Sequence, residues 1–458
     1  MIFKRKIYDK MKEWKTLSNG KSALLLEGAR RIGKSTIAEE FAQNEYKDYI
    51  ILDFAKEGKE IKTNFEDNIG DLNNFFRNLF LLKGKILPER DSVIIFDEVQ
   101  LFPKARQAIK YLVADGRYDY IETGSLISIK RNVKDILIPS EEYKLKMYPM
   151  DFEEFLWANG VQDATIQYLE TCFRTKMQVL PAVHDTMNKL FYSYIVVGGM
   201  PDVVQTYVDT HDIGKVITLQ TSLLEQYRQD IPKYADDHDK MKIKAIFDAI
   251  PSQLNDKNRR FYVNSLTPSA RLNRYENSFK WLDDAGVALP CYNVTEPQMP
   301  LALNHKHSLF KLFMNDVGLL CAACMENIQF DLLNGKLDAN LGSILENVVA
   351  QQLKANGYDL YYFDTTRYGE VDFVVSGGVQ TRLIEVKSGK DYKKHKALDN
   401  IRSVKEWKIQ DSIVLCRGNL EVDGSVTYLP WYMFIFVCPD VPPQGLIYEV
   451  DLTPLKEL

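Results

Sequence analysis

Eight residues near the amino terminus have the types and spacing of a loop that wraps around nucleotide phosphates. The run from Gly28 to Ser35, GARRIGKS, fits G-x-x-x-x-G-K-[ST]. Glycine is expected at Gly28 and Gly33 because the loop must adopt positive φ and approach the phosphates closely. Lys34 is predicted to reach the β- and γ-phosphates, and the Ser35 hydroxyl to ligate Mg²⁺. The predicted nucleotide contacts are Gly28, Ala29, Arg30, Arg31, Ile32, Gly33, Lys34, Ser35 and Thr36.

Two acidic residues, Asp97 and Glu98, follow the apolar run VIIF at residues 93–96. Such a run predicts a strand buried on both faces, as in the centre of a parallel sheet. Asp97 then emerges at the carboxyl end of the strand, where ligands of open α/β sheets bind. We therefore expect Asp97 to hold Mg²⁺ and Glu98 to polarise an attacking water.

A third polar group follows the next predicted strand, residues 118–121. A polar side chain at this position can sense the γ-phosphate, and Thr123 and Ser125 are both candidates. The sequence contains no N-K-x-D motif, which guanine recognition normally needs. An adenine nucleotide, ATP or ADP with Mg²⁺, is therefore the expected ligand.

The elements that must position these residues are visible in the hydrophobic pattern. Residues 22–27 predict a short buried strand before the phosphate loop, and residues 34–44 predict an amphipathic helix after it. Residues 102–115 predict a helix that ends at Gly116. The basic first fifteen residues also carry apolar residues at helical spacing, so we expect a helix that covers this core: Ile7, Tyr8, Met11 and Trp14.

A second group of charged residues lies in a strand-rich segment near the carboxyl terminus. Residues 358–363, 370–375 and 381–387 predict strands, and residues 344–353 predict an amphipathic helix. Because strand side chains alternate between faces, the two later strands place Asp372, Glu385 and Lys387 on one face. If the glycines at 377–378 form the turn, Asp372 lies opposite Leu383.

These side chains have the composition of a site for metal-dependent phosphodiester cleavage. Carboxylates from neighbouring strands can hold Mg²⁺, and a lysine can orient the attacking water. The predicted site comprises Asp372, Glu385 and Lys387, with Glu346 of the preceding helix completing the set. The alternative is a solvated strand face in an interaction domain.

The middle of the chain has the pattern of a winged helix-turn-helix. Residues 240–250 predict a helix that stops at Pro251, and a second helix is predicted from Thr267 until Gly286. Residues 287–295 and 298–303 follow as strand-like segments. Such a module contacts DNA phosphates through basic residues, here Lys257, Arg259, Arg260, Arg271, Arg274 and Lys280. The alternative is a structural lid or a protein-contact surface.

Length and composition limit the function classes. A chain of 458 residues predicts two to four domains, and 45% hydrophobic with 26% charged residues is typical of a soluble globular protein. The net charge of −5 means that any DNA site must be a local patch. No apolar run approaches the length of about 18 residues that a membrane span needs, and no signal-peptide core follows Met1. Six scattered cysteines indicate a reducing compartment, so we expect a cytoplasmic protein.

Taken together, the motifs resemble those of a bacterial and archaeal branch of the AAA+ ATPases. The resemblance is carried by GARRIGKS, IIFDEVQ, ETGSLIS, YKLKMYPMDFEEFL, VGGMPDVV and YRQDI. It implies an AAA+ P-loop core in 1–150, a helical lid in 151–235, a winged-helix segment in 236–305 and a C-terminal domain in 306–458. It also implies that Arg228 compensates transition-state charge. Glu122 departs from the apolar residue expected before the T-G-S turn.

The C-terminal segments EVDF at 370–373 and IEVK at 384–387 resemble the PD-(D/E)xK nuclease fold. The chain is thus interpreted as an α/β protein, an ATPase that couples Mg²⁺-dependent ATP hydrolysis to DNA binding or processing. The alternative is a nucleotide-controlled signalling or scaffold protein whose C-terminal domain binds a partner without cutting. The sequence leaves the oligomeric state open.

Overall fold

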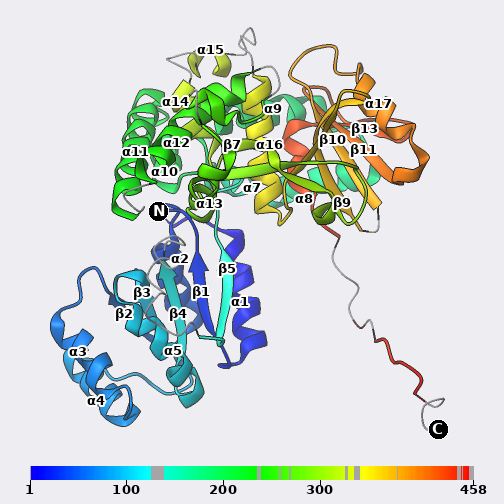
Figure 1. Cartoon of the computed structure of the whole chain (residues 1–458). Coiled ribbons are helices and arrows are strands. Elements are labelled where there is room, and N and C mark those ends of the chain that lie inside the picture. The colour runs from blue at the N-terminus through cyan, green and yellow to red at the C-terminus, as the bar shows by residue number, and fades with distance from the viewer. Residues whose placement is uncertain are drawn as a thin grey trace.

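The computed structural model describes residues 2–124, 139–234, 239–256, 259–267, 270–324, 329–334, 341–378, 380–440, 445 and 447–452. They form a smaller lobe, built from the N-terminal part of the chain, and a larger lobe above it (Figure 1). The larger lobe combines helices with a second sheet. Among the described residues, no helix has both the length and the apolar character to cross a bilayer.

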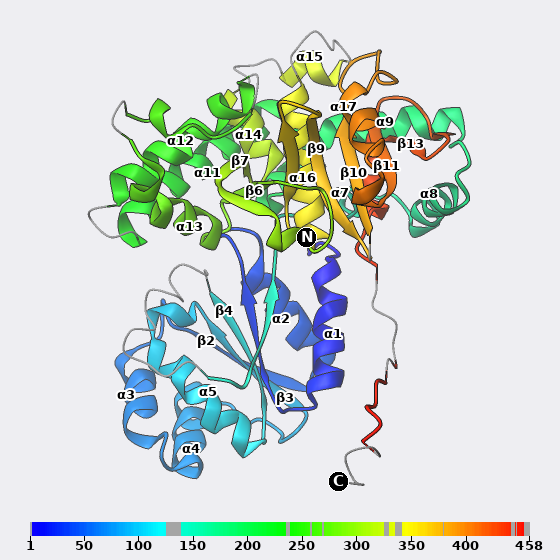
Figure 2. The same ribbon diagram turned by 45° about the vertical axis from the view of Figure 1, so that its right-hand side comes forward.

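The smaller lobe contains a five-stranded parallel sheet, which confirms the predicted α/β class. The strand order is β2-β3-β4-β1-β5, so the strand before the phosphate loop lies between β4 and β5. The arrowheads of β1 and β5 point toward the larger lobe (Figure 2). The strands are β1 (Ala23–Glu27), β2 (Asp48–Asp53), β3 (Ser92–Asp97), β4 (Asp119–Gly124) and β5 (Glu142–Lys146).

Helices pack on both faces of this sheet. The predicted N-terminal helix is present and buries Ile7, Met11 and Trp14. The predicted helix after β3 is also present and ends at Gly116, whose φ of 75° is the left-handed conformation that often ends a helix. The helices of this lobe are α1 (Lys6–Ser18), α2 (Lys34–Glu45), α3 (Lys59–Asn68), α4 (Leu72–Lys83) and α5 (Pro103–Asp115).

The chain after β5 is helical and begins the larger lobe. The turn between α9 and α10 needs two glycines: Gly198 has a φ of 75°, and a Cβ on Gly199 would collide with the Met150 carbonyl. This close packing explains the VGGMP sequence at residues 197–201. The helices are α7 (Phe152–Ala158), α8 (Asp163–Thr175), α9 (Pro181–Val197), α10 (Pro201–Thr210), α11 (Ile213–Tyr234) and α12 (Lys240–Asn255).

An eight-stranded mixed sheet forms the core of the C-terminal part. Its order is β12-β13-β11-β10-β9-β8-β6-β7. The strands are β6 (Ala288–Val294), β7 (His305–Met314), β8 (Tyr361–Thr365), β9 (Gly369–Gly377), β10 (Gln380–Val386), β11 (Ile409–Cys416), β12 (Glu421–Asp423) and β13 (Val426–Pro430). The accompanying helices are α13 (Glu276–Asp284), α14 (Val317–Cys324), α15 (Gln329–Leu333), α16 (Gly342–Ala355) and α17 (Lys396–Arg402).

The structure corrects the prediction of a separate winged helix. The segment predicted as a strand at 298–303 contains instead the 3₁₀ turn Leu301–Leu303. Pro297 and Pro300 have no backbone N–H and therefore cannot donate the hydrogen bonds that join neighbouring strands. The hairpin forms between β6 and β7, and β6 also pairs with β8, so the hairpin is the edge of the eight-stranded sheet. The predicted division after residue 305 falls inside this hairpin.

The helices of the predicted winged segment also differ from expectation. Helix α12 continues through Pro251 to Asn255, because the buried residues on both sides of the proline keep the turn packed. The later helix begins at Glu276, after a 3₁₀ turn at Leu272–Arg274.

Candidate functional site

The phosphate loop joins β1 to α2 as predicted. Gly28 and Gly33 have φ values of 156° and 91°, so both adopt the positive φ that glycine permits. A Cβ on Gly28 would collide with the Met147 carbonyl, so the loop is also packed closely against the chain that follows β5. The φ values of the two glycines and the close packing at Gly28 thus define the backbone shape of the loop.

Lys34 is held inside this loop. Its side chain is 8% exposed, and Nζ donates to the carbonyls of Gly28 at 3.2 Å and Ala29 at 2.7 Å. Burial lowers the pKa of Lys34 to about 8, against the opposing effect of the Glu98 and Asp97 carboxylates. The ammonium is therefore poorly compensated, and an anionic ligand would stabilise its charged form.

Ser35 and Asp97 meet at the carboxyl edge of the sheet. The Ser35 hydroxyl donates to Asp97 Oδ1 at 2.6 Å, and the Thr123 hydroxyl donates to the same oxygen. A hydroxyl beside a carboxylate supplies the hard oxygen donors that Mg²⁺ prefers, and Mg²⁺ usually takes only one or two protein ligands beside phosphates. These residues fit the predicted metal. Ser35 and Thr123 thus both contact Asp97, and the roles of these residues in binding metal and phosphate stay predictions.

Glu98 lies next to Asp97 in an unusual backbone conformation. Its φ of 53° is left-handed, which is uncommon for a residue with a Cβ. Its N–H donates to Thr123 Oγ1 at 3.4 Å, and its carboxylate accepts from the Gln100 side chain. This conformation directs Glu98 to the cavity at the phosphate loop. Ser125, the other predicted sensor, lies outside the described residues.

A cavity of about 570 Å³ adjoins the loop. Lys34, Ser35 and Thr36 line one side, and Pro201 and Gln205 of α10 line another. Residues that precede α1 also reach it, namely Ile2, Phe3 and Arg5. With Glu98, which follows β3, the cavity is therefore built from four separate segments of the chain.

The remaining predicted loop residues anchor the loop to the larger lobe. Ala29 and Ile32 are buried. Arg30 pairs with Asp230 of α11 at 2.5 Å, and Arg31 approaches Asp202 at 3.8 Å. The two arginines therefore line the cavity while contacting α10 and α11.

Arg228 is placed differently from the prediction. Its guanidinium contacts Glu225 at 2.5 Å and Asp248 of α12 at 2.7 Å. It does not line the cavity at the phosphate loop but a second cavity between α11, α12 and α14. Within this chain Arg228 ties α11 to α12, and the geometry gives no support for a transition-state role.

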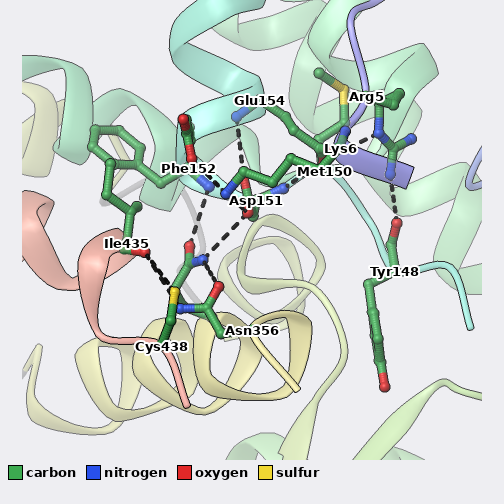
Figure 3. A network of polar contacts seen from close by, with 12 residues as sticks. Arg5, Lys6, Tyr148, Met150, Asp151, Phe152, Glu154, Asn356, Ile435 and Cys438 are labelled. Atoms are coloured by element: carbon green, nitrogen blue, oxygen red, sulfur yellow. Dashed lines mark hydrogen bonds and ion pairs between the residues drawn. The ribbon is translucent and has the colours of Figure 1, made fainter. Parts of the chain in front are cut away.

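The sequence reasoning missed a polar network at the junction of the lobes (Figure 3). Arg5 is 7% exposed; it donates to the Ile32 carbonyl at 3.0 Å and to the Tyr148 carbonyl at 2.7 Å, and it pairs with Glu154 at 3.0 Å. Arg5 therefore joins the phosphate loop to the first helix of the larger lobe. The basic cluster at residues 4–6 could have indicated this network, but the hydrophobic periodicity led us to expect only a helix that covers the core.

Lys6 and Asp151 extend this network (Figure 3). Lys6 Nζ contacts Asp151 at 2.6 Å, and Gln352 of α16 contacts the same carboxylate at 3.3 Å. Burial alone would raise the pKa of Asp151, but the Lys6 ammonium holds it below its ordinary value. The N-terminal residues thus bind α7 and α16 together.

The phosphate loop also contacts the C-terminal part of the chain. The Tyr227 hydroxyl of α11 donates to the Arg30 carbonyl at 3.0 Å. Gly286, just before β6, lies so close that a Cβ there would be 3.3 Å from the Ala29 amide nitrogen. Since β6 belongs to the eight-stranded sheet, one short segment links the loop to that sheet.

The C-terminal carboxylates are brought together, but with a different strand register from the prediction. Phe373 pairs with Ile384, so the register continued by one pair sets Asp372 opposite Glu385 rather than Leu383. The turn is closed by the pair Gly377 and Gln380, which moves the register by two residues. Because a shift of two preserves the face, the predicted shared face still holds.

Two cations that the prediction did not include sit among these carboxylates. Lys311 of β7 is fully buried and contacts Glu346 at 3.2 Å and Glu370 at 2.7 Å. Arg259 pairs with Glu346 and lies 3.7 Å from Asp372. Among the described residues, no group of three or more His, Cys, Asp or Glu side chains is arranged to hold a metal ion. The predicted Mg²⁺ site at Glu346, Asp372, Glu385 and Lys387 is thus not formed, since Lys311 and Arg259 take up the carboxylate oxygens.

Comparison with protein families supports the coarse assignment. Residues 20–156 match a family described as AAA domain. This match supports the predicted AAA-type ATPase domain in this part of the chain. Residues 188–330 and 341–434 match two families described as Domain of unknown function (DUF8612) and Domain of unknown function (DUF4143). These matches do not describe a winged helix or a nuclease.

Two relatives align with most of this chain. An uncharacterized protein of Methanocaldococcus jannaschii is 22% identical over 95% of this chain and 89% of the relative. An uncharacterized protein of Haemophilus influenzae is 21% identical over 79% of this chain and 81% of the relative.

Two solved structures show weaker similarity. The RuvB Holliday junction branch migration motor of Thermotoga maritima is 12% identical, with a TM-score of 0.27 over 62% of this chain and 89% of that one. A Signal Transduction ATPase with Numerous Domains from Pyrococcus horikoshii is 11% identical, with a TM-score of 0.26 over 75% of this chain and 47% of that one. These scores are too low to indicate a common overall fold.

Proposed function

We propose that the smaller lobe binds and hydrolyses Mg²⁺-ATP, and that the nucleotide state sets the position of the larger lobe. The contact between the Ser35 hydroxyl and Asp97, beside Lys34 and Thr123, is the observation that carries the proposal. When bound, Mg²⁺ neutralises charge on the phosphates. Ser35 and Asp97 would hold it, Lys34 would bind the terminal phosphates, and Glu98 would orient the attacking water.

The contacts of the phosphate loop support coupling between the lobes. A bound triphosphate changes the charge next to Lys34 and Arg30, and Arg30 is paired with α11. The buried Arg5 holds the Ile32 carbonyl and Glu154 at once. A shift of the loop should therefore also move α7 and α11, because these ion pairs and hydrogen bonds join the loop to both helices in a closely packed interior.

A nucleic acid is the second candidate ligand, supported by exposed basic residues of the larger lobe. Arg271, Arg274 and Lys280 are exposed near α13. Arg259 and Arg260, which were predicted to belong to the same footprint, are paired with carboxylates instead, and Lys257 lies outside the described residues. We propose DNA binding through the three exposed residues, without cleavage, as the output to be tested.

Two assays with purified full-length protein test these proposals. ATP turnover is measured for the wild type and for Lys34→Ala, with and without duplex DNA. We expect the substitution to abolish nucleotide binding or turnover, and wild-type turnover in this variant would exclude the phosphate role. DNA affinity is measured as a function of salt concentration, where a fall in affinity with rising salt supports phosphate contacts. Salt-independent or absent binding would favour a protein partner.

A further inference from the structure

Strand β5 forms one edge of the parallel sheet, and in the described part of the chain its only strand neighbour is β1. Glu141 and Met147, which flank β5, both bond to the β1 side through the backbone. Because successive residues of a strand direct their N–H and C=O groups to opposite sides, those of Lys144 and Lys146 point to the open edge. The edge therefore presents backbone donors and acceptors to a further strand.

The face of β5 that lies toward α1 is apolar. Tyr143 and Leu145 are in register with Leu24 and Leu26 of β1, and Leu145 packs on the same apolar cluster as the buried residues of α1. Tyr143 is 44% exposed although it belongs to this face, because it lies at the margin of the sheet. An apolar side chain on an added strand would cover it.

The opposite face of β5 carries two weakly compensated cations, Lys144 and Lys146. Lys144 Nζ lies 3.9 Å from Glu142, whose carboxylate is already paired with Arg106 at 2.6 Å. Burial lowers the pKa of Lys146, against the opposing effect of Asp283. The ion pairs of the described residues include none at Lys146. A strand with acids at two alternate positions would compensate both lysines.

The C-terminal residues 447–452, which we call the tail segment, have this pattern. Their sequence is IYEVDL, so Glu449 and Asp451 fall on one face of an extended chain and three apolar side chains fall on the other. The three apolar residues, which are 89%, 61% and 52% exposed, are Tyr448, Val450 and Leu452. Such a row of exposed apolar side chains is typical of a segment that docks on another surface.

The chain leaves the larger lobe near the carboxyl end of β5. Asn356, which follows α16, donates to the Val437 carbonyl at 2.8 Å, and Lys354 of the same helix is one of the charges that act on Lys146. The twelve residues from Val437 to Glu449 can span about 40 Å. The tail segment runs down on the side where α1 lies, against the direction of β5 (Figure 1, Figure 2). It can therefore reach the open edge as an antiparallel strand.

We propose that the tail segment docks on the open edge of β5 in its own molecule, as an added antiparallel strand. The structure shows the segment away from this edge, with its apolar side chains in water, and docking would cover them. Opposite charges and apolar side chains that face each other across two strands stabilise the pairing. The register that satisfies both has the pairs Lys146–Glu449, Leu145–Val450, Lys144–Asp451 and Tyr143–Leu452.

The first test is hydrogen–deuterium exchange of the full-length protein, measured by mass spectrometry on peptides that cover the tail segment. We expect these amides to exchange about fivefold faster in Lys144→Glu than in the wild type, because a like-charge pair replaces an opposite-charge pair. Adding Asp451→Lys to Lys144→Glu should restore slow exchange. Lys306→Glu is the matched control: Lys306 is exposed on β7, an edge strand of the other sheet, so the exchange should stay at the wild-type rate.

The second test distinguishes docking within one molecule from docking between two copies. Tyr143 and Leu452 would form a pair without mutual backbone hydrogen bonds, in which the Cα atoms of antiparallel strands are about 4.5 Å apart. This spacing permits a disulfide, so Tyr143→Cys combined with Leu452→Cys should cross-link on mild oxidation. We expect a cross-linked monomer on a non-reducing gel, and no such product from either single variant.

The proposal is overturned if the tail amides of the wild type exchange as fast as those of Lys144→Glu, or if Lys306→Glu has the same effect. Failure of the added Asp451→Lys to restore slow exchange would contradict the register. A cross-link that joins only two copies would exclude docking within one molecule. Circular dichroism checks the fold of each variant. If Lys144→Glu does not fold, Lys144→Gln should still accelerate the exchange, and an unchanged rate in that variant would overturn the proposal.

Discussion

Binding of ATP above pH 8 should draw a proton onto Lys34. Burial lowers the pKa of Lys34 to about 8 in the loop, from an ordinary value of 10.5. Phosphate oxygens near Nζ favour the charged form and raise this pKa again. We therefore expect uptake of about half a proton per nucleotide at pH 8, about nine tenths at pH 9, and about a tenth at pH 7.

Isothermal titration calorimetry in buffers of different ionisation enthalpy measures this uptake, with a non-hydrolysable ATP analogue as the ligand. In Glu98→Gln a carboxylate that raises the pKa of Lys34 is lost, so the uptake should begin at a lower pH. Equal uptake at pH 7 and pH 9 would refute the reasoning, since no group would then titrate in the loop. So would an unchanged profile in the variant.

The same shift sets the sign of a stability change without nucleotide. The unfolded chain binds the Lys34 proton more tightly than the folded chain. The folded state therefore gains stability as the pH rises from about 8 to 10.5, by at most about 3 kcal/mol. A Lys34→Met variant should lack this rise in the free energy of unfolding measured with urea.

Three further substitutions test the site and its supports. Glu98→Gln should retain bound ATP while single-turnover hydrolysis slows by about 10²–10⁴-fold, and rapid hydrolysis would remove Glu98 as the water activator. Gly199→Ala should destabilise the fold by about 3 kcal/mol or more in thermal unfolding, because the new Cβ would collide with a backbone carbonyl. Gly160→Ala is the control: there is open space around Gly160, so this substitution should cost only about 1–2 kcal/mol of backbone strain. Arg5→Ala leaves a buried carboxylate uncompensated and should cost about 3–5 kcal/mol, while the exposed Lys4→Ala should change the melting temperature little; equal effects would contradict the buried network.

The sequence by itself determined the phosphate loop of the smaller lobe and the candidate nucleotide-binding residues around it. The strand, glycine loop and helix around Lys34 are contiguous in the chain, and the positive φ of Gly28 and Gly33 follows from local sterics. Asp97 could be placed because an apolar run ending in an acid locates the carboxyl edge of a buried strand. Side-chain alternation likewise placed Asp372 and Glu385 on one face.

Only the tertiary structure decided what surrounds these residues. The strand register at Asp372 depends on which residues close the turn, and a shift by two leaves the hydrophobic pattern unchanged. Lys311 stands in an apolar run, but only the structure shows that it is buried and which carboxylates compensate it. In the sequence, an ion-paired arginine such as Arg259 cannot be distinguished from an exposed arginine that contacts DNA. Its ion pairs with residues from remote elements depend on how those elements pack, and local periodicity carries no information about that packing.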